Sequence, residues 1–315
     1  VGDNGVGIFS TGNSITLNAG STIETGNNEA VGIFTSGTGP MNIVSEAAMT
    51  IGDGSYGYVL KSTGTTLDSR TAGVTLGNKT VYIYSSDSSA NITNRTAVTS
   101  TGRENYGIYS AGSVNNLADL NLSSGVGNVG IFSINGGTAV NGNNAGIRPV
   151  ISVSGTDRTD LDNQLYGIGM AAGYLDKDTG NLITTGNIVN YGTINVGNEG
   201  GIGMYAVGSG SSAKNYGDVN LSANGTVGMY LDKNAVGENY GTIRTVAGST
   251  ANGMIGVVLM NHAILKNYGQ IIVEGAGNKG VYNDGGDYQS TGGTVTATGG
   301  ASDVVVPADV SDTSK

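Results

Sequence analysis

Residues 31–34 read VGIF, and segments of the same type recur every 25 residues along the first third of the chain. The five copies are VGIF at 6–9, VGIF at 31–34, YGYV at 56–59, VYIY at 81–84 and YGIY at 106–109. A period of this size is typical of proteins built from stacked structural repeats. The sequence therefore predicts one elongated body in which each repeat forms one rung of the stack.

Each repeat divides into three short apolar segments that are separated by Gly, Asn, Ser, Thr and Asp. Such segments are typical of strands joined by tight turns, and three of them per repeat make one coil of a parallel β-helix. No segment keeps the 3.6-residue apolar period of an amphipathic helix. We predict an all-β parallel β-helix with three short strands per rung of about 25 residues and about 11 rungs. This shaft is expected to occupy residues 1–298, and residues 299–315 to form a tail or a partial cap.

Residues two apart on a strand point the same way, so alternation assigns the faces of the first strand in each rung. The position after the glycine is expected in the core, as Ile8, Ile33, Tyr58, Ile83, Ile108, Ile131, Ile168, Met204, Met229, Val257 and Val281. The next position is expected to face outward, as Phe9, Phe34, Val59, Tyr84, Tyr109, Phe132, Gly169, Tyr205, Tyr230, Val258 and Tyr282. We interpret this outward column as stabilising contacts between rungs. A sugar-stacking or protein-docking stripe is the alternative.

The second half of the chain repeats the word Asn-Tyr-Gly at the start of one strand in each rung. The asparagines concerned are Asn190, Asn215, Asn239 and Asn267. Amide side chains repeated at one position of stacked strands can bond to the neighbours above and below. The pattern predicts an asparagine ladder with a structural role.

Composition and charge exclude several classes of function. The 315 residues include 56 Gly and no Cys, and the net charge is −10. Binding of nucleic acid or an anionic membrane needs a cluster of Lys and Arg side chains, and the sequence contains no such cluster. No stretch approaches the roughly 20 apolar residues that span a bilayer, so direct membrane insertion is not expected. Without Cys there are no thiolate sites, and we expect no metal and no cofactor.

The chain contains the segments NYGTI at 190–194 and GIGMYA at 201–206, and its rungs are polar, acidic and without Cys. In these features it resembles the passenger domain of a Gram-negative autotransporter adhesin, most closely of the fusobacterial type. The resemblance covers roughly residues 1–298. It implies a right-handed β-helix, displayed outside the cell and tethered through a C-terminal β-barrel of a longer precursor. It also implies attachment to a receptor on host cells or other bacteria, either a protein or a glycan.

Two insertions interrupt the 25-residue period, at 154–165 (SGTDRTDLDNQL) and at 173–183 (GYLDKDTGNLI), and both flank one rung. Insertions in stacked repeats emerge as loops, where binding functions are often found. We expect the two loops to lie near each other if they emerge on the same side. The candidate receptor-binding residues are Asp157, Arg158, Asp160, Asp162, Tyr174, Asp176, Lys177 and Asp178.

Other kinds of site have weaker support in the sequence. Residues 176–181 (DKDTGN) resemble a calcium loop poorly, because the glycine is out of place and the closing glutamate is absent, and a two-strand hairpin explains them better. His262 is the only histidine and lies in an expected turn, without a nucleophile nearby. A β-helix polysaccharide lyase would need clustered carboxylates and a basic cleft. We therefore predict a non-enzymatic adhesin segment, with a structural spacer or a polysaccharide-cleaving enzyme as the alternatives.

Overall fold

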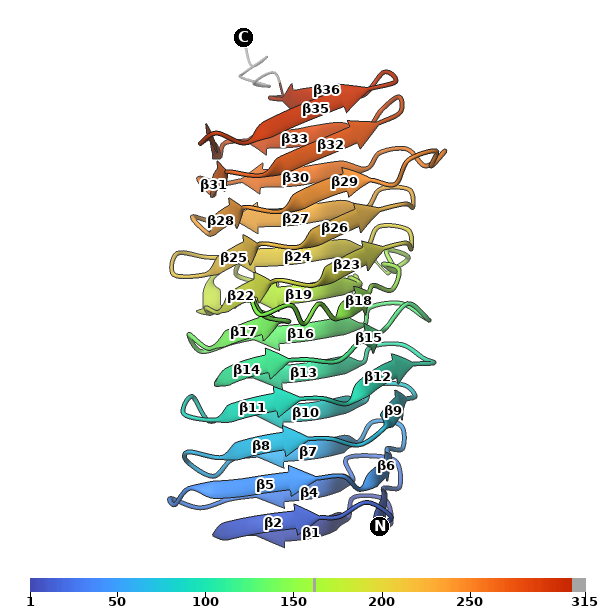
Figure 1. The fold of residues 1–315 in the computed structure, drawn as a ribbon, viewed down its shortest axis with the longest axis vertical. Helices are drawn as coiled ribbons and strands as arrows, with labels where there is room; N and C mark the ends of the chain where they lie inside the picture. The colour runs from blue at the N-terminus through green and yellow to red at the C-terminus, as the bar shows by residue number, and fades with distance from the viewer. Residues whose placement is uncertain (161–162, 308–315) are drawn as a thin grey trace.

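The computed structural model describes residues 1–160 and 163–307 and shows a β-helix whose rungs rise along one axis from the N-terminus to the C-terminus (Figure 1). Three parallel sheets run along this axis, each formed by corresponding strands of successive rungs. The predicted right-handed parallel β-helix is confirmed. The first sheet contains 12 strands, one more than the expected number of rungs.

Sheet 1 is formed by the first strand of each rung. Its strands are β1 (Val6–Ser10), β4 (Val31–Thr35), β7 (Tyr56–Leu60), β10 (Val81–Ser85), β13 (Tyr106–Ser110), β16 (Val129–Ser133), β19 (Ile168–Ala172), β24 (Ile202–Val207), β27 (Val227–Asp232), β30 (Ile255–Met260), β33 (Lys279–Asp284) and β36 (Ser302–Val305). β36 lies in the segment expected as a tail and pairs with β33. The VGIF-type segments thus form the longest sheet of the molecule.

Sheet 2 is formed by the second strand of each rung and contains 11 strands. They are β2 (Asn13–Leu17), β5 (Met41–Ser45), β8 (Thr66–Ser69), β11 (Asn91–Asn94), β14 (Ser113–Asn116), β17 (Thr138–Asn141), β22 (Asn187–Asn190), β25 (Ser212–Asn215), β28 (Val236–Asn239), β31 (Ile264–Asn267) and β34 (Asp287–Ser290).

Sheet 3 is formed by the third strand of each rung and contains nine strands. They are β9 (Gly73–Leu76), β12 (Ala97–Ser100), β15 (Leu120–Asn121), β18 (Val150–Ser152), β23 (Thr193–Val196), β26 (Asp218–Leu221), β29 (Thr242–Thr245), β32 (Gln270–Glu274) and β35 (Thr294–Thr298). The first two rungs contribute a separate pair, β3 (Thr22–Glu24) and β6 (Ala48–Thr50). The described part of the chain contains no helix that is long and apolar enough to cross a membrane.

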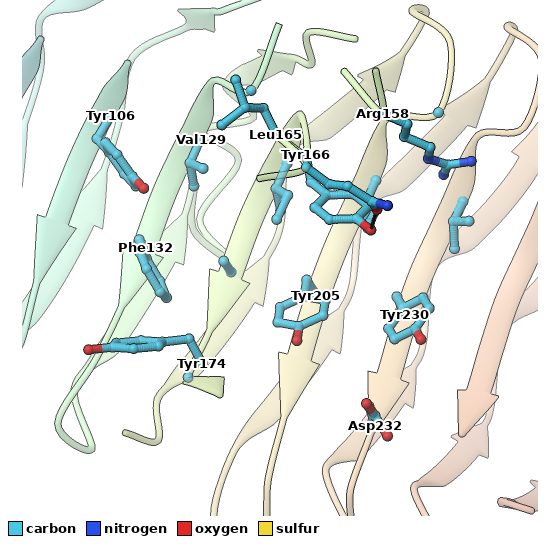
Figure 2. A pocket seen from close by; sticks show the side chains of 18 residues that line it. Tyr106, Val129, Phe132, Arg158, Leu165, Tyr166, Tyr174, Tyr205, Tyr230 and Asp232 are labelled. Carbon is cyan, nitrogen blue, oxygen red and sulfur yellow. Dashed lines mark hydrogen bonds between the residues drawn. The ribbon is translucent and has the colours of Figure 1, made fainter. Parts of the chain in front are cut away.

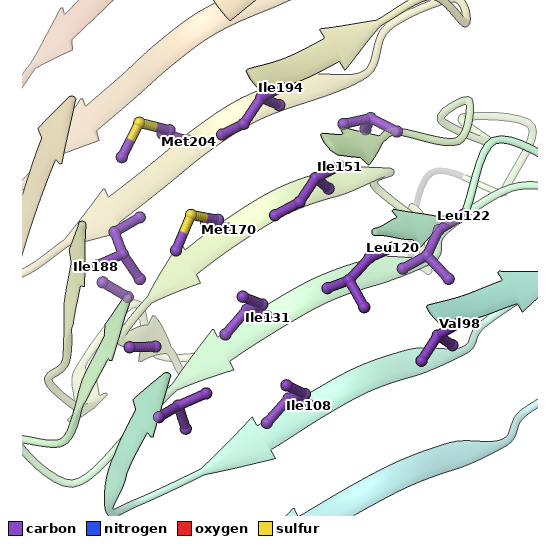
Figure 3. Close-up of a cluster of buried hydrophobic side chains, with 14 of the residues drawn as sticks. Val98, Ile108, Leu120, Leu122, Ile131, Ile151, Met170, Ile188, Ile194 and Met204 are labelled. Carbon is purple, nitrogen blue, oxygen red and sulfur yellow. The ribbon is translucent and has the colours of Figure 1, made fainter. Parts of the chain in front are cut away.

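The core is a narrow column enclosed by the three sheets (Figure 3). Ile108, Ile131 and Met204 of sheet 1 point inward and are fully buried, as the alternation predicts. Ile151 and Ile194 of sheet 3 meet them from the facing side. Each rung buries only a few aliphatic side chains, so the stability of the shaft depends on the stacking of neighbouring rungs.

The register of β19 differs from the prediction. Ile168 is expected in the core and Gly169 in the outward column, but β19 is shifted by two residues, so that Met170 is buried in the core and Ala171 takes the outward position. The segment 166–168 reads YGI and imitates the start of a rung. Gly169 is the true member of the glycine column, because a Cβ at this residue would lie 2.6 Å from a backbone oxygen of β24.

The predicted asparagine ladder is confirmed and is longer than expected, but the Asn-Tyr-Gly segments do not start a strand as predicted, because each asparagine ends a strand and the Tyr-Gly that follows forms the turn. The members of the ladder are buried at the ends of sheet 2 strands, and each side-chain amide donates to the side-chain oxygen of the next, along Asn94, Asn116, Asn141, Asn190, Asn215, Asn239 and Asn267. These hydrogen bonds are 2.7–3.0 Å long. Because the ladder passes through the rung that carries both insertions, it fixes the register of that rung against its neighbours.

Candidate functional site

The outward column of sheet 1 stacks aromatic rings along the axis and is interrupted at Val59, Ala171 and Val258. The rings of Tyr109 and Phe132 lie 4.9 Å apart, and those of Tyr205 and Tyr230 lie 5.7 Å apart. Ala171 pairs with Phe132 on one side and with Tyr205 on the other. The ladder therefore lacks one ring between these two, and the ring faces that would contact it are left without a partner from the column.

Residues 154–165 form one wall of this gap. They leave the end of β18 and return to the start of β19, closed by an antiparallel bridge between Asp157 and Leu165. Leu165 and the following Tyr166 lie over the sheet, and Tyr166 is 39 % exposed. The end of the first insertion, at Gln164 and Leu165, thus lies on the outer face of sheet 1.

Residues 173–183 form the opposite wall. They make the hairpin of β20 (Tyr174–Leu175) and β21 (Leu182–Thr184), which agrees with the predicted two-strand hairpin. Tyr174 follows Gly173 and turns its ring toward Phe132, at 5.9 Å and an interplanar angle of 63°. This insertion also lies against the outer face of sheet 1, at the other end of β19.

A groove of about 510 Å³ lies between these walls. Figure 2 shows its floor, made by side chains of sheet 1, with Phe132 on one side of the gap and Tyr205 and Tyr230 on the other; Tyr174 of the second insertion lies beside Phe132. Polar groups stand at its rim. Arg158 and Asp232 lie on opposite sides of Tyr230. The arrangement combines aromatic surfaces with hydrogen-bonding groups, which is the usual character of a small-molecule or glycan site.

Three tyrosines of the groove, Tyr106, Tyr205 and Tyr230, are neutral over a wide pH range. Burial, and to a smaller extent the charge of Glu104, raises the pKa of Tyr106. Burial, and to a smaller extent the charge of Asp232, raises the pKa of both Tyr205 and Tyr230. Their hydroxyl groups therefore remain protonated near neutral pH and can donate hydrogen bonds to a ligand.

A second hollow of about 360 Å³ adjoins the groove on the same face. The two share Tyr106, Gly127 and Leu165 as lining residues. Tyr84 and Tyr109 contribute to the second hollow alone, and their rings are in edge contact at 5.5 Å. We call the first cavity the gap groove and the second the distal hollow.

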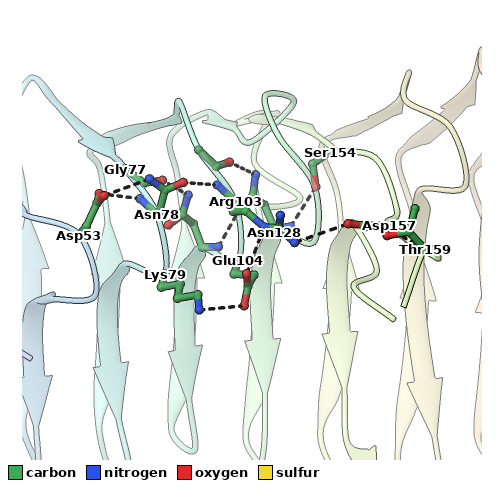
Figure 4. A network of polar contacts seen from close by, with 12 residues as sticks. Asp53, Gly77, Asn78, Lys79, Arg103, Glu104, Asn128, Ser154, Asp157 and Thr159 are labelled. Atoms are coloured by element: carbon green, nitrogen blue, oxygen red, sulfur yellow. Dashed lines mark hydrogen bonds and ion pairs between the residues drawn. The ribbon is translucent and has the colours of Figure 1, made fainter. Parts of the chain in front are cut away.

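Asp157 anchors the first insertion to the shaft and does not line the groove (Figure 4). Its carboxylate accepts hydrogen bonds from the backbone and hydroxyl of Thr159 and pairs with Arg103 at 3.5 Å. The Thr159 hydrogen bonds, with a smaller effect of Arg103, lower the pKa of Asp157. Arg103 belongs to a row of turn residues on one corner of the shaft, which includes Asp53 and Asn78.

The other predicted residues divide between the groove and the hairpin turn. Arg158 and Tyr174 line the gap groove. Asp176 caps the hairpin turn by accepting hydrogen bonds from the backbone N–H groups of Asp178 and Thr179. Asp162 lies outside the described residues. Among the described residues, no group of three or more His, Cys, Asp or Glu side chains could hold a metal ion.

Residues of both insertions line the gap groove, so the two loops lie on the same side of the shaft. The hydrogen bond and charge of Asp178 raise the pKa of Lys177, and the charge of Asp160 in the other insertion adds to this effect. Lys177 and Asp178 form an exposed ion pair of 2.8 Å at the hairpin tip. The two insertions therefore lie on the same face of the shaft, on opposite sides of the gap groove.

Sequence reasoning missed the floor of the groove. Ala171 was hidden by the register error in β19, and Tyr166 by its likeness to the start of a rung. Tyr205 and Tyr230 were assigned to the outward column but not to a site. The available signal was the coincidence of two features, because the outward column lacks a ring at Val59, Ala171 and Val258 and the rung of Ala171 also carries both insertions.

Comparison with known families gives one match. The family model described as the BigA third pectate lyase-like domain matches residues 2–242, which is about three quarters of the chain and includes the whole gap groove. Comparisons with curated proteins and with solved structures gave no match. Both insertions, the groove and the greater part of the parallel β-helix thus lie within the matched region, and the chain belongs to the family of BigA third pectate lyase-like domains.

Proposed function

We propose that this chain is a non-enzymatic attachment segment of a bacterial surface adhesin, and that it binds a glycan receptor in the gap groove. One observation carries the proposal: the aromatic column loses its ring at Ala171, where two insertions wall the resulting gap. A purely structural rung has no need of either insertion. The receptor belongs to a host cell or to another bacterium, and the parent protein is held on the outer surface of a Gram-negative cell.

The chemistry of the groove suits a sugar ring. Sugars present apolar C–H faces and polar hydroxyl edges, and the gap offers ring faces of Phe132 and Tyr205 together with phenol hydroxyls and the carboxylate of Asp232. A protein receptor would require a larger complementary surface than this narrow groove provides, because stable protein interfaces bury about 800 Å² per partner.

A polysaccharide lyase is the second candidate, and the pectate lyase-like name of the family favours it. Elimination from an acidic sugar needs a base at the reacting carbon and cations that stabilise the carboxylate. The described lining of the gap groove contributes one basic residue, Arg158, and one acidic residue, Asp232. They stand on opposite sides of Tyr230, so they do not form a compact acid–base pair.

The test is a glycan-array screen with the fluorescently labelled protein and two variants. Tyr174→Ala removes a wall of the groove, and Lys177→Ala, at the exposed tip of the same hairpin, is the matched control. We expect Tyr174→Ala to weaken binding about ten-fold, which corresponds to ~1.4 kcal/mol, and Lys177→Ala to bind like the wild type. Absence of binding by the wild type supports the spacer, and new unsaturated ends in polygalacturonate support the lyase; either result contradicts the proposal.

A further inference from the structure

The aromatic surface of sheet 1 extends beyond the gap groove into the distal hollow. Tyr106, Gly127 and Leu165 line both cavities, so the two cavities adjoin at these three residues, of which Leu165 belongs to the first insertion. Together they reach from Tyr56 on β7 to Asp232 on β27. In the order of sheet 1 these two strands are six strand spacings apart, or roughly 29 Å at about 4.8 Å per spacing.

We propose that the two cavities form one binding surface for an uncharged linear glycan chain, which lies along the helix axis and passes over Leu165. The inference rests on the proposed function and adds to it the class, the direction and the minimum length of the ligand. A chain that contacts both cavities must be an oligosaccharide of several units, because a single sugar reaches only one of them.

The proposed direction of the glycan chain follows from the regular spacing of the strands in sheet 1. Strands of sheet 1 succeed each other at about 4.8 Å, so equivalent side chains recur along the axis at that interval. An extended glycan also repeats its units along its length, at a similar spacing. Tyr84 and Tyr109 on one side of Leu165 and Tyr205 and Tyr230 on the other offer repeated contacts to such a chain.

The proposal that the glycan is uncharged follows from the residues around the two cavities. Lys79 and Glu104 line the distal hollow and face each other, with Nζ and Oε2 3.9 Å apart. Arg103, beside that hollow, pairs with Glu104 at 3.1 Å and with Asp157 at 3.5 Å. In the gap groove the one basic and one acidic lining residue balance each other. A polyanion with one carboxylate per sugar would meet a surface without excess positive charge, on a protein of net charge −10.

The experiment measures affinity against ligand length by isothermal titration calorimetry. The probes are the neutral cello-, chito-, xylo-, manno- and malto-oligosaccharides, each from the disaccharide to the octasaccharide, with oligogalacturonates as the acidic counterpart. For the neutral series that binds, we expect affinity to rise with length until both cavities are occupied and then to level off. Oligogalacturonates should bind more weakly at every length.

Three variants locate the contacts. Tyr84→Ala alters the distal hollow and should weaken the octasaccharide about ten-fold without affecting the shortest ligand that binds. Tyr205→Ala alters the gap groove and should weaken short and long ligands alike. Tyr282→Ala, in the same outward column but outside both cavities, is the control for an altered column. Thermal melting of each variant shows whether the fold is retained.

Length-independent affinity, an unchanged octasaccharide affinity in a folded Tyr84→Ala variant, or preferential binding of oligogalacturonates would overturn this inference and leave the gap groove as a glycan site. Failure of every series to bind would instead contradict the proposed function itself. The two failures are therefore distinguishable in one set of titrations.

Discussion

Removal of one amide from the middle of the asparagine ladder should destabilise the shaft strongly. The buried Asn215 side chain donates to Asn239 at 2.9 Å and to the Gly217 backbone oxygen at 3.1 Å, and it accepts from Asn190 at 3.0 Å. Asn215→Ala leaves an N–H of Asn190 and the side-chain oxygen of Asn239 without these partners. A buried polar group left unsatisfied costs about 1–3 kcal/mol. Two such groups predict a loss of about 4 kcal/mol in the free energy of unfolding.

Urea unfolding followed by circular dichroism measures this loss, provided that the m-value is unchanged. The exposed Asn144 offers a matched control on the same residue type, and Asn144→Ala should change the free energy of unfolding by less than about 0.5 kcal/mol. A loss below about 1 kcal/mol for Asn215→Ala would refute the reasoning. It would mean that water or a shifted neighbour replaces the missing amide, and that the ladder does not hold the rungs together.

Three further changes test the packing, the pH response and the anchoring of the first insertion. Gly169→Ala places a Cβ 2.6 Å from a backbone oxygen and should lower the free energy of unfolding in urea by about 1–3 kcal/mol. Gly73→Ala, where the nearest such contact is at 3.6 Å, should lower it clearly less. Equal losses in the two variants would contradict the close approach at Gly169. Hydrogen bonds from a neighbouring rung lower the pKa of Asp53, so its stabilisation is complete above the ordinary pKa of 3.8 and disappears as the pH falls through the folded-state value. The difference in melting temperature between wild type and Asp53→Asn should therefore shrink in acid, and a constant difference would argue against this linkage. Arg103→Ala removes the ion pair to Asp157 and should speed hydrogen exchange at the Asp157 amide, with little change in the free energy of unfolding. Unchanged exchange would show that the first insertion is held in place without Arg103.

The fold could be predicted from the sequence because each rung is a local unit and successive rungs repeat the same sequence motifs. The VGIF-type segments and the glycines that precede the core column recur at 25-residue intervals, which is enough to define the strands and their faces. The same reliance on sequence motifs explains the error in the predicted register of β19. The letters YGI at 166–168 look like the start of a rung, while the close backbone approach that requires Gly169 depends on distances between strands.

The candidate site was only partly accessible to sequence reasoning. The insertions were located by the broken period, and the hairpin at 173–183 by its turn residues. Their position against sheet 1 depends on tertiary contacts, such as the ring of Tyr174 on Phe132 and the ion pair between Arg103 and Asp157. No spacing rule reports such contacts. The first half of the asparagine ladder was missed for a related reason, because Asn94 lacks the Tyr-Gly that marks the later members.

The most direct test of the account is to fill the gap at Ala171 and measure glycan binding. Ala171 is only 3 % exposed and lies between the positions of Phe132 and Tyr205, so a ring in Ala171→Phe should complete the column and occupy the groove. Val258→Phe, which adds a ring to the same column outside the groove, is the matched control. The account predicts that both variants melt close to the wild type and that Ala171→Phe alone loses binding. Wild-type affinity in a folded Ala171→Phe variant would contradict it.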